Sequence, residues 1–219
     1  MVDVTSPPPG TEPAFTDLHL PTSHGRPTTG FVLVLHGGAE RTHEPVDGRS
    51  LSWRRGRALA RQLGQRLADD GIGVALLRYR VKGWNAGAAA LPSPVPDARW
   101  ALDALTRQHG VPVAIVGHSM GARTGVAVAD HPAVRGVVAL APWLPADEPI
   151  QPLTGKILRV AHGRRDKITS ARASRRYVDR AAAVADAEFT DMGRAGHYLL
   201  TQVGRWNAFA EQGVREVLG

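Results

Sequence analysis

Residues 113–121 read VAIVGHSMG and join an unbroken apolar run to a serine between two glycines. The apolar part has the composition of a strand buried on both faces of a parallel sheet, and a helical pattern of small residues follows Ser119. Where a strand meets a helix, a G-x-S-x-G sequence makes a sharp turn, and its glycines let neighbouring segments pass close by. We therefore expect the Ser119 hydroxyl at the carboxyl edge of a sheet, with the backbone N–H of Met120 pointing to the same place.

Similar patterns extend in both directions from this motif. The other short apolar runs, each typical of a buried strand, are residues 31–35, 74–77, 137–140 and 157–160, with a further strand at 187–191. The helical patterns between them cover residues 53–69, 96–109, 120–130, 170–184 and 203–217. Residues 15–20 predict an antiparallel edge strand. The alternation indicates one α/β domain over residues 15–219, with a doubly wound, mostly parallel sheet, preceded by a disordered tail at 1–14.

Three other polar motifs follow predicted strands. Residues 36–38, HGG, form a glycine-rich turn after the run 31–35, where a backbone N–H could serve as a second oxyanion donor beside that of Met120. Residues 162–166, HGRRD, place Asp166 after the run 157–160, and residues 193–197, GRAGH, place His197 after 187–191. The carboxyl ends of parallel strands share one edge of a sheet, so a serine, a carboxylate and an imidazole are expected to meet there.

On these four motifs the sequence resembles the α/β-hydrolase superfamily, over about residues 15–218. The resemblance implies that Ser119 is the nucleophile, His197 the base and Asp166 the acid that orients it. It also implies oxyanion donors at Met120 and at Gly38 or a neighbour, and it implies neither a cofactor nor a metal. The chain order of serine, aspartate and histidine is the one expected for this fold.

Several other residues need an interpretation. Some relatives carry the acid after the strand that corresponds here to 137–140, which makes Asp147 the alternative, but the HGxxD context favours Asp166. The resemblance gives His36, His118 and His162 structural roles, and we expect each to bond to backbone.

The residues around the pocket are less clearly marked by motifs. Many relatives insert a helical lid, whereas only about residues 144–155 are available here, too few for a lid domain. The long loops 39–52 and 81–95 leave the functional edge and are expected to form the pocket walls. Trp84 and Trp143 follow strands at that edge and are candidates for the pocket surface. Trp100 and Trp206 lie in helical patterns and are expected to pack.

The composition argues against several classes of function. The chain has 219 residues, 43% of them hydrophobic, and no cysteine, which excludes disulfides, thiolate metal sites and cysteine nucleophiles. The net charge of +7 comes with arginines that are dispersed among acids and not interleaved with aromatic residues, so we expect no nucleic-acid partner. No signal sequence or bilayer-spanning stretch is visible, which predicts a soluble, cytoplasmic protein without a membrane partner.

The reaction that these residues predict is hydrolysis of a carboxylic ester or thioester, a small-molecule acyl substrate, through an acyl-enzyme on Ser119. The same triad would serve an acyltransferase or a cofactor-free perhydrolase, in which the acyl acceptor differs. A hydrolase-like binding protein without turnover is a third hypothesis, and the complete triad argues against it. The acyl and alcohol groups of the substrate and the oligomeric state are not encoded in these motifs.

Overall fold

The computed structural model describes residues 11–21, 27–87 and 90–219. Most of the predicted N-terminal tail, residues 1–10, lies outside the described residues, and the first strand begins at Ala14. None of the helices in the described ranges is long and apolar enough to cross a bilayer.

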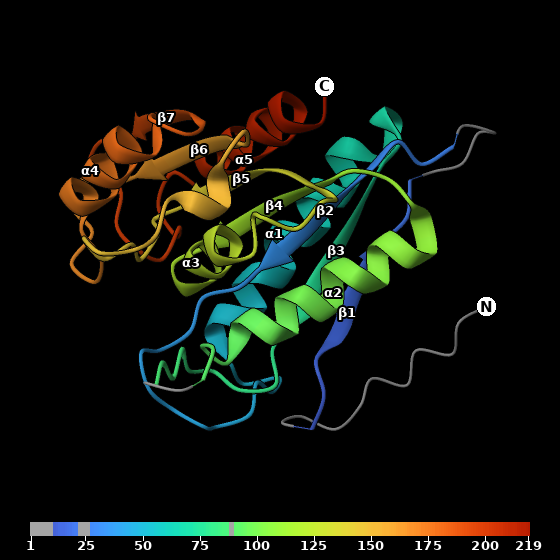
Figure 1. Cartoon of the computed structure of the whole chain (residues 1–219), viewed down its shortest axis with the longest axis horizontal. Coiled ribbons are helices and arrows are strands. Elements are labelled where there is room, and N and C mark those ends of the chain that lie inside the picture. Colours follow the sequence, from blue (N-terminus) through green and yellow to red (C-terminus); the bar gives the residue numbers. More distant parts are fainter. Residues whose placement is uncertain (1–10, 22–26, 88–89) are drawn as a thin grey trace.

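A seven-stranded sheet in the order β1-β3-β2-β4-β5-β6-β7 forms the centre of the molecule (Figure 1). The strands are β1 (Ala14–His19), β2 (Gly30–Leu35), β3 (Ile72–Arg78), β4 (Val113–His118), β5 (Val134–Leu140), β6 (Ile157–His162) and β7 (Asp186–Asp191). All pairs are parallel except β1–β3, so the predicted antiparallel edge strand is confirmed. Every residue of β2, β3 and β4 is buried, because helices cover both faces of the sheet, which explains their continuous apolar sequences.

Five α-helices form the two outer layers of the described chain. Helices α1 (Leu51–Leu67) and α5 (Val203–Leu218) pack on one face, where Leu63 and Trp206 belong to one hydrophobic cluster. Helices α2 (Pro94–His109), α3 (Met120–Ala127) and α4 (Ala171–Ala181) pack on the other, where Leu102 and Tyr177 belong to a second cluster. The predicted α/β-hydrolase fold class is confirmed.

Glycines end several of the helices. Gly110 ends α2 in the left-handed region at φ 65°, where its N–H bonds to the Thr106 carbonyl oxygen. Gly71 ends the short 3₁₀ helix η1 (Ala68–Asp70) in the same way, at φ 75°, and its N–H bonds to the Ala68 carbonyl oxygen. Helices α3 and α4 each end three residues before the predicted position, because the chain already turns there toward the next strand.

The carboxyl ends of β2, β4, β5, β6 and β7 open onto one edge of the sheet. The connection between β5 and β6 contains only the one-turn 3₁₀ helix η2 (Gln151–Leu153), so no helical lid is inserted there. The edge that carries the polar motifs therefore lacks the cover that a lid domain would provide.

Candidate active site

Ser119 occupies the sharp turn between β4 and α3. Its backbone has φ 54° and ψ −116°, a conformation that residues with a Cβ rarely adopt. The two flanking glycines make the turn possible. A Cβ on Gly121 would lie 2.1 Å from the Leu35 carbonyl oxygen, and one on Gly117 would lie 2.5 Å from the Ala122 nitrogen. The G-x-S-x-G pattern is thus a steric requirement of this strand–turn–helix junction.

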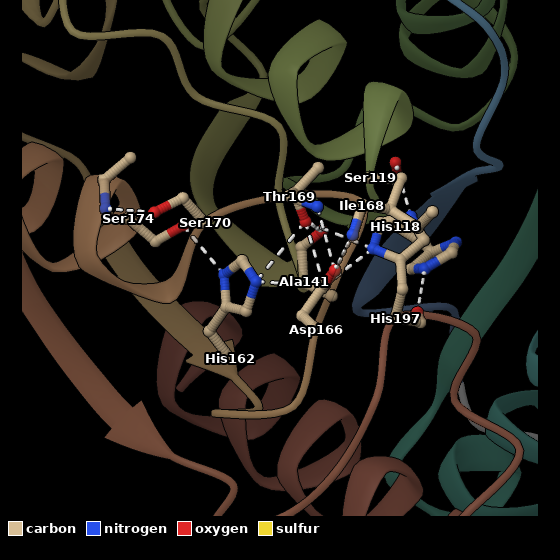
Figure 2. A network of polar contacts seen from close by, with 11 residues as sticks. His118, Ser119, Ala141, His162, Asp166, Ile168, Thr169, Ser170, Ser174 and His197 are labelled. Atoms are coloured by element: carbon tan, nitrogen blue, oxygen red, sulfur yellow. Dashed lines mark hydrogen bonds and ion pairs between the residues drawn. The ribbon is translucent and has the colours of Figure 1, made fainter.

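Three loops bring a serine, a histidine and an aspartate into one hydrogen-bonded chain (Figure 2). Ser119 Oγ lies 3.0 Å from His197 Nε2, and His197 Nδ1 lies 2.7 Å from Asp166 Oδ2. Ser119 is 7% exposed, His197 is 6% exposed and the Asp166 side chain is 1% exposed, so solvent competes little for these bonds. An ionised carboxylate only accepts hydrogen bonds, so Nδ1 carries the hydrogen and Nε2 accepts that of the serine.

The Asp166 carboxylate accepts five hydrogen bonds. Its Oδ2 atom receives His197 Nδ1, His162 Nε2 at 3.0 Å and Thr169 Oγ1 at 2.9 Å. Its Oδ1 atom receives the backbone N–H groups of Ile168 and Thr169, each at 2.8 Å. Burial acts to raise the pKa of Asp166, but the bonds from His162, His197 and the two backbone N–H groups outweigh it and hold the pKa well below its usual range. Asp166 is therefore ionised throughout the neutral range.

Two other histidines hold the loops of the site through backbone bonds. His118 Nε2 donates to the His197 carbonyl oxygen at 2.9 Å, and His36 Nδ1 donates to the Gly37 carbonyl oxygen at 2.7 Å. Burial lowers the pKa of His118 to about 3, and the neighbouring His197 adds to the effect. Burial lowers the pKa of His36 to about 4. Both rings are neutral at pH 7 and bond to backbone, as expected.

His162 differs from the expectation. Its partners are three side chains, those of Asp166, Ser174 and Thr169, and the prediction of a backbone bond is wrong. The reason is the position of the ring between the acid loop and helix α4, which contributes Ser174. Sequence reasoning also missed Thr169, whose place three residues after an aspartate is typical of a side-chain-capped turn. Nothing in the local pattern marks Ser174.

Among the N–H groups around Ser119, those of Gly38 and Met120 donate to no backbone acceptor in the described part of the chain. The next turn residue is excluded as a donor, because the Ala39 N–H bonds to the Lys82 carbonyl oxygen at 2.9 Å. A Cβ on Gly38 would lie 2.2 Å from that same oxygen and 2.5 Å from Met120 Cε. Only a glycine allows the turn after β2 to approach the start of α3 this closely.

A cavity of about 250 Å³ opens next to Ser119. Its walls come from the ends of β2, β4, β5 and β6 and consist of Gly38, Ala39, Glu40, Ser119, Trp143, Ile168 and Thr169. The loop 39–52 contributes its first residues, whereas no described residue of the loop 81–95 lines this cavity. Residues 88–89 of that second loop lie outside the described part.

The structure places Trp84 behind the cavity wall, so the expectation that it forms the pocket surface is corrected. Trp84 is only 4% exposed, and its ring meets that of Trp143 edge to face at 6.1 Å. The guanidinium of Arg123 lies over both rings, 4.2 Å from the Trp84 centroid and 4.5 Å from that of Trp143. Trp84 is thus a buried support, and Trp143 alone of the pair reaches the cavity.

The remaining predicted residues have clear places. Asp147 is exposed and makes no hydrogen bond to Ser119, His197 or Asp166 within the described chain, so Asp166 is the carboxylate that the fold brings to the histidine. Trp206 is buried, as expected, and Trp100 packs against Phe15 at 5.2 Å while 38% exposed. The described ranges contain no group of three or more His, Cys, Asp or Glu side chains able to hold a metal ion.

Comparison with solved structures finds the same fold in other proteins. A serine hydrolase without a lid from Xanthomonas campestris superposes with a TM-score of 0.64 at 19% identity, over 93% of this chain and 88% of the other. An esterase from Pyrococcus furiosus gives 0.64 at 16% identity, over 88% and 82%. Est1E from Butyrivibrio proteoclasticus gives 0.65 at 12% identity, over 92% and 93%. At these identities the likeness establishes the fold.

No curated protein matches the sequence significantly. The profile of the alpha/beta hydrolase family, in contrast, matches residues 32–218, which include all four motifs of the site. The chain therefore belongs to the alpha/beta hydrolase family.

Proposed function

We propose that the protein is a serine hydrolase that cleaves small carboxylic esters through an acyl-enzyme on Ser119. The observation that carries the proposal is the continuous chain from Ser119 Oγ through His197 to Asp166, which opens into the cavity beside Ser119. Membership of the family and the esterases among its structural neighbours support it.

The reaction follows from the position of each group. As Ser119 Oγ bonds to the carbonyl carbon, its proton passes to His197 Nε2, 3.0 Å away. The ester C–O bond then breaks, and the same proton passes from Nε2 to the departing alkoxide. Water attacks the acyl-enzyme by the same route in reverse and releases the acid and the free serine. Asp166 keeps its negative charge throughout, which stabilises the transient imidazolium.

The oxyanion forms beside the N–H groups of Gly38 and Met120, which donate to no backbone acceptor in the described part of the chain. Two preorganised donors at that position stabilise the tetrahedral intermediate more than the planar ester, which lowers the barrier. In enzymes of this kind one such donor accounts for about 3 to 4 kcal/mol.

The cavity suggests the size of the substrate. Its volume of about 250 Å³ suits a short acyl or alcohol group, and Trp143 and Ile168 provide apolar wall surface. The missing lid leaves the site open to dissolved substrates. Thioesters have the same reacting carbonyl and are expected to compete as substrates.

A panel of p-nitrophenyl esters from acetate to dodecanoate tests the proposal. We expect turnover that is highest for the short chains and that disappears in Ser119→Ala. Ser52→Ala is the matched control, because Ser52 lies on helix α1 and takes no part in the site. Methanol added to the assay shows whether an alcohol intercepts the acyl-enzyme. Equal turnover by the wild type and Ser119→Ala would refute the proposal.

A further inference from the structure

Asp166 carries a second histidine in addition to that of the triad. His162 and His197 lie on opposite sides of the carboxylate (Figure 2), and both bond to its Oδ2 atom. The other nitrogen of His162 lies 2.9 Å from Ser174 Oγ, as the other nitrogen of His197 lies 3.0 Å from Ser119 Oγ. The structure thus contains two Ser–His arms that share one aspartate, and only the arm with Ser119 reaches the cavity.

The second arm is fully enclosed. His162 and Ser174 have no exposed surface, and the Asp166 side chain is 1% exposed. Since the carboxylate can only accept, His162 Nε2 carries the hydrogen. The other ring nitrogen, Nδ1, shares a hydrogen bond with Ser174 Oγ at 2.9 Å. The two bonds hold the His162 ring between Asp166 and Ser174.

The important feature is that both histidines bond to the same oxygen atom of Asp166, Oδ2. Oδ2 accepts from His162, Thr169 and His197, which exceeds the two lone pairs that an oxygen offers. Each added donor withdraws negative charge that would otherwise act on His197. The same imidazole must accept a proton from the serine and release it within each turnover, so an acid that held the charged ring too strongly would slow the release.

We propose that His162, oriented by Ser174, is a positioning residue that fixes Asp166 and limits how strongly this carboxylate stabilises protonated His197. It acts through Asp166 and the Thr169 hydroxyl beside it, and it neither bonds to Ser119 nor lines the cavity. The inference deepens the proposed function, on which its catalytic meaning rests.

The other charged or titratable groups around His197 are few. Asp166 faces its Nδ1 atom, and the His118 ring from the end of β4 lies 5.0 Å away. Tyr198 is the next residue, with its ring at 5.4 Å, and the Arg55 guanidinium of α1 lies 4.8 Å over that tyrosine. Burial lowers the pKa of His118 to about 3, so this ring stays neutral in the neutral range. Thr169 Oγ1, which bonds to the same Asp166 oxygen, lies 3.1 Å from His197 Nδ1 and 3.3 Å from His162 Nε2. A change at His162 therefore reaches His197 through Asp166 and this hydroxyl.

The test is an NMR titration of the His197 ring protons between about pH 5 and pH 9. In His162→Leu we expect the midpoint to move to higher pH by about half a unit, because Asp166 has lost one donor and binds the imidazolium more strongly. In His162→Gln, whose amide can donate from the same place, the midpoint should return toward that of the wild type. The acid limb of kcat/KM should move with the NMR midpoint.

Two further variants make the result decisive. Ser174→Ala removes the group that orients His162 and should give a smaller shift in the same direction, even if His162→Leu does not fold. His131→Leu is the control, since it removes a different His–Asp pair, with Asp103, far from the site. An unchanged midpoint in both His162→Leu and Ser174→Ala would overturn the inference and leave a purely structural role. The titration needs no substrate, so its outcome is independent of whether Ser119 proves to be a nucleophile.

Discussion

At the scale of single residues, the surroundings of Asp166 determine what this carboxylate can do. Five hydrogen bonds stabilise its ionised form and hold its pKa well below the ordinary value of an aspartate. Asp166 therefore orients His197 and stabilises its charged form, and it does not itself carry the proton.

Asp166→Asn should lower kcat by a factor on the order of 10⁴, as loss of the orienting carboxylate does in other triads. The asparagine amide can present a hydrogen toward His197 Nδ1, which favours the tautomer that cannot accept from Ser119. Asp147→Asn, at an exposed position after β5, serves as the control and should remain near the wild type. Steady-state kinetics in which Asp147→Asn is the inactive variant would assign the acid to the other loop.

At the scale of single elements, the turn after β2 depends on Gly38. A Cβ there would lie 2.2 Å from the Lys82 carbonyl oxygen, so Gly38→Ala must displace the turn and its N–H. We expect kcat to fall about 10²- to 10³-fold with little change in KM, as when one oxyanion donor is lost.

Gly48→Ala is the matched control for this prediction. Gly48 lies in the loop that follows the same turn, and a Cβ there would have no neighbour within 4 Å. Its kinetics should equal those of the wild type. Full activity of Gly38→Ala would show that the N–H of this turn is not an oxyanion donor.

Two tryptophans at the cavity wall, Trp143 and Trp84, have different roles that mutations can separate. Trp143 faces the cavity, whereas Trp84 lies beneath it, and the Arg123 guanidinium between them bonds to the buried Glu148 at 2.5 Å. We expect Trp143→Ala to change the ranking of esters by chain length, because it enlarges the cavity.

Trp84→Ala should act on stability instead. Removal of a buried tryptophan costs about 3 to 5 kcal/mol of the free energy of unfolding, measurable by urea denaturation, while the ranking of esters is kept. If Trp84→Ala changed the ranking and Trp143→Ala did not, the assignment of the two rings would be reversed.

The same elements show what the sequence could predict. The central strands were predictable because burial on both faces leaves an unbroken apolar run, as in β2 and β4. The places of Ser119, Asp166 and His197 followed from strand ends that share one edge. In contrast, the contacts of His162 with Ser174 and of Trp84 with Arg123 join segments whose approach is set by packing, and no local pattern encodes them.

At the scale of the whole molecule, buried neutral histidines make the fold sensitive to acid. His36 and His118 have pKa values of about 4 and about 3 in the folded protein, below the ordinary value of 6.5. The unfolded chain therefore binds more protons at mildly acidic pH, so stability is lost as the pH falls through 6.5 toward 4. Asp166 acts in a lower window, because its depressed pKa gives stability that is lost only below its ordinary value of 3.8.

We expect each of the two histidines to reduce the free energy of unfolding by about 1 kcal/mol per pH unit within this window. Urea denaturation at several pH values measures the slope. His36→Asn, whose amide can donate to the Gly37 carbonyl oxygen without titrating, should make the slope shallower. An identical slope in this variant and the wild type would contradict the burial of a neutral His36.

The central claim is that Ser119 is the activated nucleophile, and labelling with a fluorophosphonate followed by peptide mass spectrometry tests it most directly. The strained turn, the bond to His197 and the adjacent cavity predict a single adduct on Ser119. They also predict no labelling of Ser119→Ala and much slower labelling of Asp166→Asn. An adduct on another residue, or undiminished labelling of Ser119→Ala, would contradict the account.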